Sequence, residues 1–252
     1  MAKISIAADD HAYRITLDDP PLNILDIEML EQLRDAIAGV KPDRHALIID
    51  AAGEKAFSAG ASVHDHLGDR VVTMLERFHD CFRTLAKLDL VTVALVRGAA
   101  LGGGCELAMA CDFVLASDRA KFGQPEINLG VFPPVAAYQL SRLAPPRRGL
   151  ELLLTGETID AQTAASLGLV NAVFPAAEFD ARADAWLQRL WRQSASSLRF
   201  ARKAFRLAQS ADFDERLAAV ERLYLEELMK TNDANEGLTA FVEKRKPAWS
   251  GR

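Results

Sequence analysis

The sequence predicts an α/β core followed by a helical C-terminal region. Short apolar runs at residues 46–51, 91–96 and 113–116 have the length and composition of buried strands. Residues 71–88 lie between the first two strands and carry apolar side chains at helical spacing. Strands that alternate with helices imply right-handed crossovers and a largely parallel sheet. We therefore predict the α/β fold class.

The first elements of the chain have the patterns of a hairpin and a helix. Residues 4–7 and 13–17 resemble two short strands on either side of Asp9 and Asp10. Asp26 is suited to cap a helix, because its side chain can accept a hydrogen bond from an N–H of the first turn. Apolar residues follow it at helical spacing: Ile27, Leu30, Leu33 and Ile37.

After Pro133 the pattern becomes helical almost throughout. Pro134 suits the first position of a helix, where no intrahelical partner needs its missing N–H. Further helices are predicted at 177–191, 197–208, 213–229 and 235–243. We divide the chain into an α/β core, 1–195, and a helical region, 196–252, that is expected to serve oligomerisation. Aromatic residues near and within this region are expected in core or subunit contacts: Trp186, Trp191, Phe200, Phe205 and Tyr224.

Composition and charge argue against several classes of function. The 252 residues carry a net charge of −5 and give a pI of about 5.6, which disfavours a nucleic-acid binder held by phosphate contacts. The N-terminus turns polar too soon for a signal peptide, and no apolar run reaches the ~20 residues of a membrane span. Three cysteines without a CxxC pair suit reduced thiols. We expect a cytoplasmic protein without nucleic-acid or membrane partners.

Two glutamates, Glu106 and Glu126, each follow a turn-forming signal. A carboxylate pair can move protons at a carbon next to a carbonyl, provided that the fold brings the two together. Glu106 is predicted in the first turn of a helix whose next residues are apolar. The alternatives are a helix charge favoured by the macrodipole at Glu106 and an ordinary loop glutamate at Glu126.

Two segments of small residues, 57–61 and 102–104, follow predicted buried strands. Such segments allow the backbone to pass close to a ligand, and the N–H groups of Ala61 and Gly103 could converge on one oxygen. Two such donors would form an oxyanion hole, which stabilises an enolate. The alternatives are a tight turn at 57–61 and close helix–strand packing at 102–104. The glycines match neither GxGxxG nor a P-loop.

The chain resembles the crotonases, that is, the enoyl-CoA hydratase/isomerase superfamily. The resemblance covers nearly the whole chain in the expected order, at residues 21–25, 57–61, 98–108, 120–127, 154–156, 160–161, 168–171 and 240–247. It implies a crotonase-like spiral of ββα units with a helical C-terminal region, assembled as a homo-trimer or a dimer of trimers. It also implies an acyl-CoA substrate whose thioester oxygen lies between the N–H groups of Ala61 and Gly103.

The resemblance also implies roles for individual residues. Glu106 would orient or deprotonate water, and Glu126 would exchange the proton at the substrate carbon. Lys244 matches a basic residue that meets the CoA phosphates or adenine pocket, with a solvated lysine as the alternative. The remaining residues expected to bind substrate are Ala59, Gly60, Phe132 and Pro134. Coenzyme A is part of the substrate, so no cofactor is expected.

The chain departs from many hydratases at Ser62, where they have Asp, and at residues 131–137, where they have a glycine-rich turn. Pro134 has no N–H to offer a catalytic water, and it makes the pocket stiffer. Residues 57–63 with His66, together with residues 130–137, resemble the narrower group of cyclohexa-1,5-diene-1-carbonyl-CoA hydratases.

These features predict a hydro-lyase that adds water to a conjugated enoyl-CoA, with a cyclic dienoyl-CoA as the expected substrate. A straight-chain enoyl-CoA hydratase and an enoyl-CoA isomerase are the alternatives on the same scaffold. A non-catalytic CoA-binding or RNA-associated scaffold is the alternative from another class. His64 and His66 flank Asp65, but no third ligand is evident nearby, so we expect pocket-wall or helix-start residues rather than a metal site.

Overall fold

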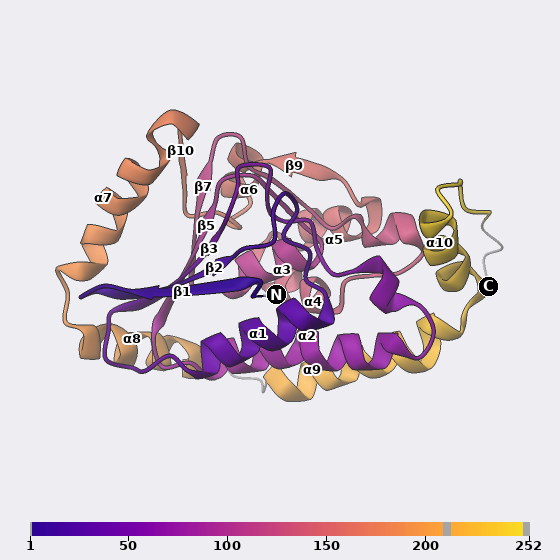
Figure 1. Cartoon of the computed structure of the whole chain (residues 1–252), viewed down its shortest axis with the longest axis horizontal. Coiled ribbons are helices and arrows are strands. Elements are labelled where there is room, and N and C mark those ends of the chain that lie inside the picture. The colour runs from indigo at the N-terminus through magenta and orange to yellow at the C-terminus, as the bar shows by residue number, and fades with distance from the viewer. Residues whose placement is uncertain (1, 209–212, 249–252) are drawn as a thin grey trace.

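A computed structural model describes residues 2–208 and 213–248, and its centre is a six-stranded sheet (Figure 1). The strand order is β1-β2-β3-β5-β7-β10. The first two strands form the predicted antiparallel hairpin, and each later neighbour in this order pairs in parallel. The bounds are β1 (Ile4–Ala8), β2 (Ala12–Leu17), β3 (Ala46–Ala51), β5 (Val91–Val96), β7 (Phe113–Ser117) and β10 (Ala172–Phe174).

A second, four-stranded sheet was missed by the sequence analysis. It consists of β4 (Ala56–Ser58), β6 (Ala99–Leu101), β8 (Lys121–Gly123) and β9 (Thr158–Asp160), in that order. Each strand has only three residues, too few to establish the alternation that marks a strand in sequence. The segment 57–61 begins within β4 and the segment 102–104 follows β6, so neither directly follows β3 or β5. β9 and β10 also interrupt the part that was predicted to be helical almost throughout.

Two helices, α1 (Ile27–Ala38) and α2 (Arg70–Lys87), lie side by side against the first sheet (Figure 1). The predicted cap is present, because the Asp26 carboxylate accepts a hydrogen bond from the Met29 N–H at 2.8 Å. The predicted apolar face of α2 is buried along its length: Met74, Leu75, Phe78, Phe82 and Leu85.

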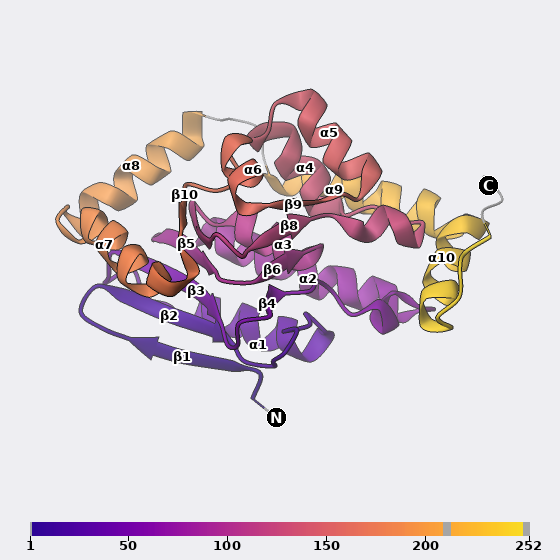
Figure 2. The ribbon, with the colours of Figure 1, turned by 90° about the horizontal axis from the view of Figure 1, so that it is seen from above.

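The remaining helices surround this centre, with α7 and α8 at one end of the molecule and α10 at the other (Figure 2). Their bounds are α3 (Gly103–Ala110), α4 (Pro134–Leu143), α5 (Pro146–Thr155), α6 (Ala161–Ser166), α7 (Phe179–Trp191), α8 (Ala195–Ala208), α9 (Phe213–Arg222) and α10 (Asn232–Val242). The short turns are η1 (Val63–His66), η2 (Pro125–Leu129), η3 (Ala176–Glu178), the π-helical η4 (Leu223–Glu227) and η5 (Leu228–Lys230). Pro134 begins α4, as predicted. The helix predicted at 213–229 instead changes to π and then 3-10 geometry after α9.

The C-terminal helices share the main hydrophobic core of the protein. Leu217, Tyr224, Ala234 and Leu238 belong to the same buried cluster as residues of α1, α2 and β3. Phe200 and Phe205 differ from them, because 69% and 66% of these side chains are exposed. The division at residue 195 stays a prediction. Of the helices that the structure describes, none is both long and apolar enough to span a membrane.

Candidate active site

Three parallel strands of the second sheet place the site. β4 pairs with β6 and β6 with β8, all in parallel, so their carboxyl ends lie along one edge. The segments that leave this edge are 59–61, 102–104 and 124–126. The edge where parallel strands end is where α/β proteins place their ligands. The predicted N–H donors and both glutamates thus come from neighbouring segments.

The first two segments approach each other closely because both contain glycine. Gly60 has φ +102°, and a Cβ on it would lie 3.0 Å from the Leu101 oxygen and 3.3 Å from the Gly103 nitrogen. A Cβ on Gly103 would lie 3.2 Å from the Ala61 nitrogen. The backbone nitrogens of Ala61 and Gly103 therefore flank one small space, as the oxyanion prediction requires.

Both of these N–H groups are left out of the nearby backbone hydrogen bonds. The bridge between Leu25 and Ala61 uses the Leu25 N–H, which donates to the Gly60 oxygen, and the Ser62 N–H, which donates to the Leu25 oxygen. Gly103 is the first residue of α3, where an N–H has no intrahelical acceptor. Two donors can thus serve a ligand oxygen in this space.

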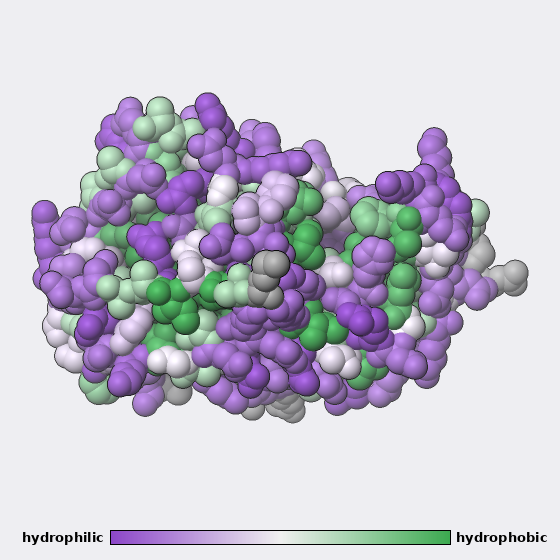
Figure 3. All heavy atoms as spheres, viewed as in Figure 1, coloured by the Kyte–Doolittle hydropathy of each residue, from purple (hydrophilic) through white to green (hydrophobic). Residues whose placement is uncertain are grey.

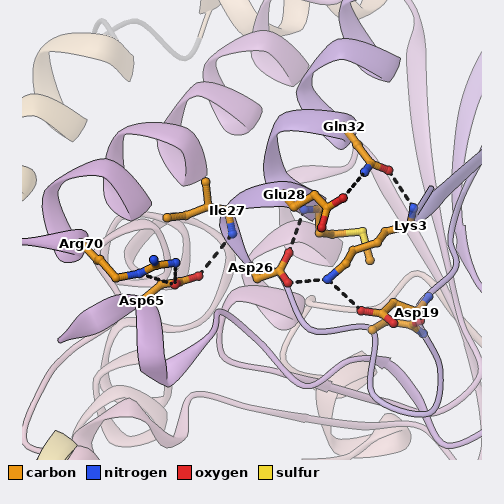
Figure 4. Close-up of polar contacts among 10 residues, drawn as sticks. Lys3, Asp19, Asp26, Ile27, Glu28, Gln32, Asp65 and Arg70 are labelled. Atoms are coloured by element: carbon orange, nitrogen blue, oxygen red, sulfur yellow. Dashed lines mark hydrogen bonds and ion pairs between the residues drawn. The ribbon is translucent and has the colours of Figure 1, made fainter. Parts of the chain in front are cut away.

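A buried carboxylate fastens the loop that carries Ala61 (Figure 4). Asp65 in η1 is 3% exposed, and it accepts hydrogen bonds from the Ile27 N–H at 3.3 Å and from Arg70 Nη2 at 2.5 Å. On the other side of the same helix start, Lys3 bridges Asp19 and Asp26. Charge-assisted hydrogen bonds therefore tie η1 to the beginning of α1 and hold the loop in place.

Glu106 lies in the first turn of α3 and is only 2% exposed. Its Oε1 accepts a hydrogen bond from the Ala136 N–H at 2.6 Å, and Gln139 Nε2 donates to its backbone oxygen at 3.1 Å. Ala136 lies in the first turn of α4, whose N–H groups favour a negative charge. Pro134, at the start of the same helix, has no N–H to contribute.

Glu126 reaches the same region from η2. A Cβ added to Gly102 would lie 2.4 Å from Glu126 Oε1, so the carboxylate rests against the start of α3. Gly102 has φ +51°, a left-handed conformation that disfavours other residues. The second oxygen, Oε2, is buried and has no hydrogen-bond partner among the described residues.

The two carboxylates are protonated far more readily than exposed ones. Burial raises the pKa of Glu126 to about 7. Burial, and then the charge of Glu126, raise the pKa of Glu106 well above its usual value, against the opposing N–H groups of Ala136 and Val135. Because two neighbouring buried carboxylates resist ionising together, the pair holds a proton near neutral pH. The N–H groups of Ala136 and Val135 reduce the rise in the pKa of Glu106 but do not cancel it.

A cavity of about 430 Å³ unites these groups. Every predicted site residue except Lys244 lines it: Ala59, Gly60, Ala61, Gly103, Glu106, Glu126, Phe132 and Pro134. The rest of the wall is mostly apolar and includes Met74, Phe78, Leu238 and Phe241. The helix α10 forms part of this wall. In the space-filling view, apolar side chains reach the surface beside α10, at the right (Figure 3). A larger cavity of about 810 Å³ lies under α8, but it contains neither glutamate.

Two residues considered in the sequence analysis, His66 and Lys244, lie at different places relative to the cavity. His66 lines the cavity, and its Nδ1 lies 2.8 Å from the Ser62 oxygen; burial lowers its pKa, so the ring is neutral and Nδ1–H is the donor. Lys244 follows α10 with φ +56° and is exposed outside the cavity. Its assignment to CoA stays a prediction. The sequence analysis did not identify Leu238 and Phe241 as site residues, since only the fold brings α10 to η2.

Comparisons with known proteins agree on one family. The model of the enoyl-CoA hydratase/isomerase family matches residues 9–252. The chain is 40% identical to a cyclohexa-1,5-dienecarbonyl-CoA hydratase of Thauera aromatica, over 99% of this chain and 97% of the relative. It is 33% identical to a short-chain-enoyl-CoA hydratase of Clostridium acetobutylicum, over 92% and 91%. A crystal structure of an enoyl-CoA hydratase from Mycobacterium avium subsp. paratuberculosis superposes with a TM-score of 0.87 at 29% identity, covering 99% of both chains.

Proposed function

Because the chain belongs to the enoyl-CoA hydratase/isomerase family, we propose that it hydrates a cyclic conjugated dienoyl-CoA. The broader activity follows from the family and its relatives: the protein is an enoyl-CoA hydratase, a hydro-lyase that acts on acyl-CoA thioesters. The observation that carries the proposed mechanism is the cavity that holds two buried carboxylates and two backbone donors together.

The proposed reaction begins when the thioester oxygen enters the space between the N–H groups of Ala61 and Gly103. The oxygen of water then adds to the electron-poor end of the conjugated system, while Glu106 takes a proton from that water. The electron pair of the double bond moves toward the thioester oxygen, and the two N–H groups stabilise the resulting enolate. Glu126 delivers its proton to the substrate carbon, which completes the addition. No cofactor takes part beyond the CoA of the substrate.

The shared proton suits this division of roles. Water addition needs one carboxylate that is ionised and one that is protonated, and a pair holding one proton provides both. The Ala136 N–H opposes the rise in the pKa of Glu106, and the proposed reaction assigns the charge to Glu106 and the proton to Glu126 in the substrate complex. Glu126 has a pKa of about 7, so it can both give and regain a proton near neutral pH.

The choice of a cyclic substrate rests on two observations. The relative from Thauera aromatica is named for a cyclic dienoyl-CoA and is 40% identical over nearly the whole chain. Pro134 and Phe132 also form a stiff wall beside the glutamates. A straight-chain enoyl-CoA is the second candidate, because the relative from Clostridium acetobutylicum is named for short-chain substrates. Isomerisation is less suited to the site, since it needs only one of the two carboxylates.

We also propose that the protein assembles as a trimer or a dimer of trimers, with Lys244 near the CoA phosphates of its own or a neighbouring subunit. The exposed side chains Phe200 and Phe205 are suited to a subunit contact. Size-exclusion chromatography with light scattering tests the assembly. Lys244→Ala should raise the KM for acyl-CoA without lowering kcat, and an unchanged KM would remove this residue from the CoA site.

The deciding experiment offers the purified protein cyclohexa-1,5-diene-1-carbonyl-CoA and, separately, crotonyl-CoA in ¹⁸O-labelled water. Products are followed by mass, with Glu106→Gln as the inactive control. Gain of labelled water on the diene alone supports the proposal. Gain on crotonyl-CoA alone makes the protein a straight-chain hydratase. A product without label identifies an isomerase, and binding of acyl-CoA without turnover favours a non-catalytic scaffold.

A further inference from the structure

A tyrosine of the C-terminal region lies behind the wall of the active-site cavity. Tyr224 belongs to the π-helical turn η4 and is 1% exposed. Its ring meets the ring of Phe132 edge to face, with centroids 5.4 Å apart. Phe132 in turn lines the cavity. π-helical turns are rare and occur often at functional sites, which gives this segment a reason to be irregular.

The hydroxyl of Tyr224 is buried without a hydrogen-bond partner among the described residues. The same is true of Oε2 of Glu126. A buried polar group without a partner is costly, so both atoms need one. A phenol can donate and a carboxylate oxygen can accept, so these two orphaned atoms are complementary.

The charged groups around Tyr224 also support its role as a hydrogen-bond donor. Burial first, and then the charges of Glu126 and Glu106, raise the pKa of Tyr224, so its hydroxyl keeps its proton and remains a donor. Cys105 also lies near the pair, but burial raises the pKa of its thiol to about 12 and keeps it neutral. His66, elsewhere on the cavity wall, is neutral as described above. The glutamates are therefore the charges that Tyr224 meets.

We propose that Tyr224 is a positioning residue for proton transfer, and that its hydroxyl donates to Oε2 of Glu126 through one bridging water. This proposal rests on the proposed function in one respect, that Glu126 exchanges a proton with substrate. The contact fixes the orientation of the carboxylate and favours its ionised form. It also supplies a hydrogen-bond donor from the C-terminal region to a site in which Pro134 has no backbone N–H to offer.

Gln124 is the competing donor. Its side-chain nitrogen and oxygen are buried without partners among the described residues, and it is close to Glu126 in sequence. Its side chain, however, also lies close enough to the Cys105 thiol to lower the pKa of that thiol slightly against the effect of burial. Among the described residues Tyr224 has no such second group, and the charges of both glutamates raise its pKa. The two candidates are separated by Tyr224→Phe and Gln124→Met, which each remove the donor and keep much of the bulk.

The test measures the Glu126 carboxyl directly, without substrate. Its carboxylic-acid C=O band is titrated by infrared spectroscopy and assigned by its loss in Glu126→Gln. Because a hydrogen bond to the ionised form is lost, Tyr224→Phe should move the midpoint upward by about one pH unit. Tyr13→Phe is the matched control, since the Tyr13 hydroxyl donates to Asp43 at an exposed position. An unchanged midpoint in Tyr224→Phe, or a shift in Gln124→Met alone, overturns the proposal.

Kinetics provide the second readout. In Tyr224→Phe we expect kcat to fall about tenfold and the alkaline limb of the kcat/KM profile to move to higher pH, with KM nearly unchanged. A raised KM with unchanged kcat and profile would indicate a packing role and contradict the inference. If the wild-type protein hydrates no enoyl-CoA but the infrared midpoint still shifts in Tyr224→Phe, the proposed function fails while the contact stands.

Discussion

Replacing Glu126 with glutamine should make the protein more stable at alkaline pH while it removes activity. In the folded protein the pKa of Glu126 is about 7, against 4.5 for the ordinary carboxyl that it becomes on unfolding. A raised folded pKa contributes stability that is fully present below 4.5 and is lost as the pH rises through 7. Glutamine resembles the protonated carboxyl and does not titrate, so the variant escapes this loss.

The size of the effect follows from the two pKa values. Their difference corresponds to about 3 kcal/mol of unfolding free energy, most of which is lost between about pH 4.5 and about pH 7. For a chain of this length, that amounts to a difference in Tm of about 6–12 °C between variant and wild type at the alkaline end. Below about pH 4 the two proteins should unfold at similar temperatures.

Differential scanning calorimetry of both proteins across this pH range measures the effect. Glu157→Gln, which makes the same change at an exposed position, is the control and should leave the wild-type curve unchanged. In parallel, kcat of Glu126→Gln should fall by about 10²–10⁴. If the Tm difference between Glu126→Gln and wild type is the same at acid and alkaline pH, the reasoning from burial is wrong. Wild-type-like turnover would refute the role of this residue in proton transfer.

Three further substitutions test the site and its closure. Glu106→Gln should lower kcat by about 10²–10⁴ in the hydration assay, because water loses its base; a smaller loss would contradict that role. Gly103→Ala places a Cβ 2.8 Å from Phe78 Cε2 and 3.2 Å from the Ala61 nitrogen, so kcat should fall by about 10²–10³ while circular dichroism stays native-like, and full activity would show that the space between the two donors accepts a methyl group. In Gly237→Ala the new Cβ would lie 1.9 Å from the Leu129 oxygen, so α10 must move away from η2. We expect about 1–3 kcal/mol of destabilisation and faster proteolysis of α10, and an unaltered digest would show that the contact can adapt.

The sequence predicted the long elements of the fold because their patterns are repeated enough to recognise. The apolar face of α2 and the largely apolar run of β5 each extend over several residues, and both are buried as expected. The second sheet could not be found in this way. Its strands have three residues each, and they exist because of pairing with partners distant in sequence, such as Ala56 with Ala99.

The site also contains residues that the sequence alone could identify and residues that only the fold reveals. Glu106, Glu126 and the glycines were found from sequence because carboxylates in apolar surroundings and clustered glycines are chemically distinctive. The sequence could not show that Gly102 permits Glu126 to rest on α3, since this depends on a left-handed backbone angle. Tyr224 was expected in the core or in a subunit contact, and only its position behind Phe132 reveals its proximity to the site.

The two sides of the active-site cavity are made at different times during protein synthesis. Residues 59–61 and the two glutamates leave the ribosome early, whereas Leu238 and Phe241 follow after more than a hundred further residues. A nascent chain that has folded its two sheets therefore carries its carboxylates in an open, wetter surface. Water there would screen the charges and return the carboxylates toward ordinary acidity. Catalytic competence should consequently appear only after α10 has emerged and docked, as one of the last events of synthesis.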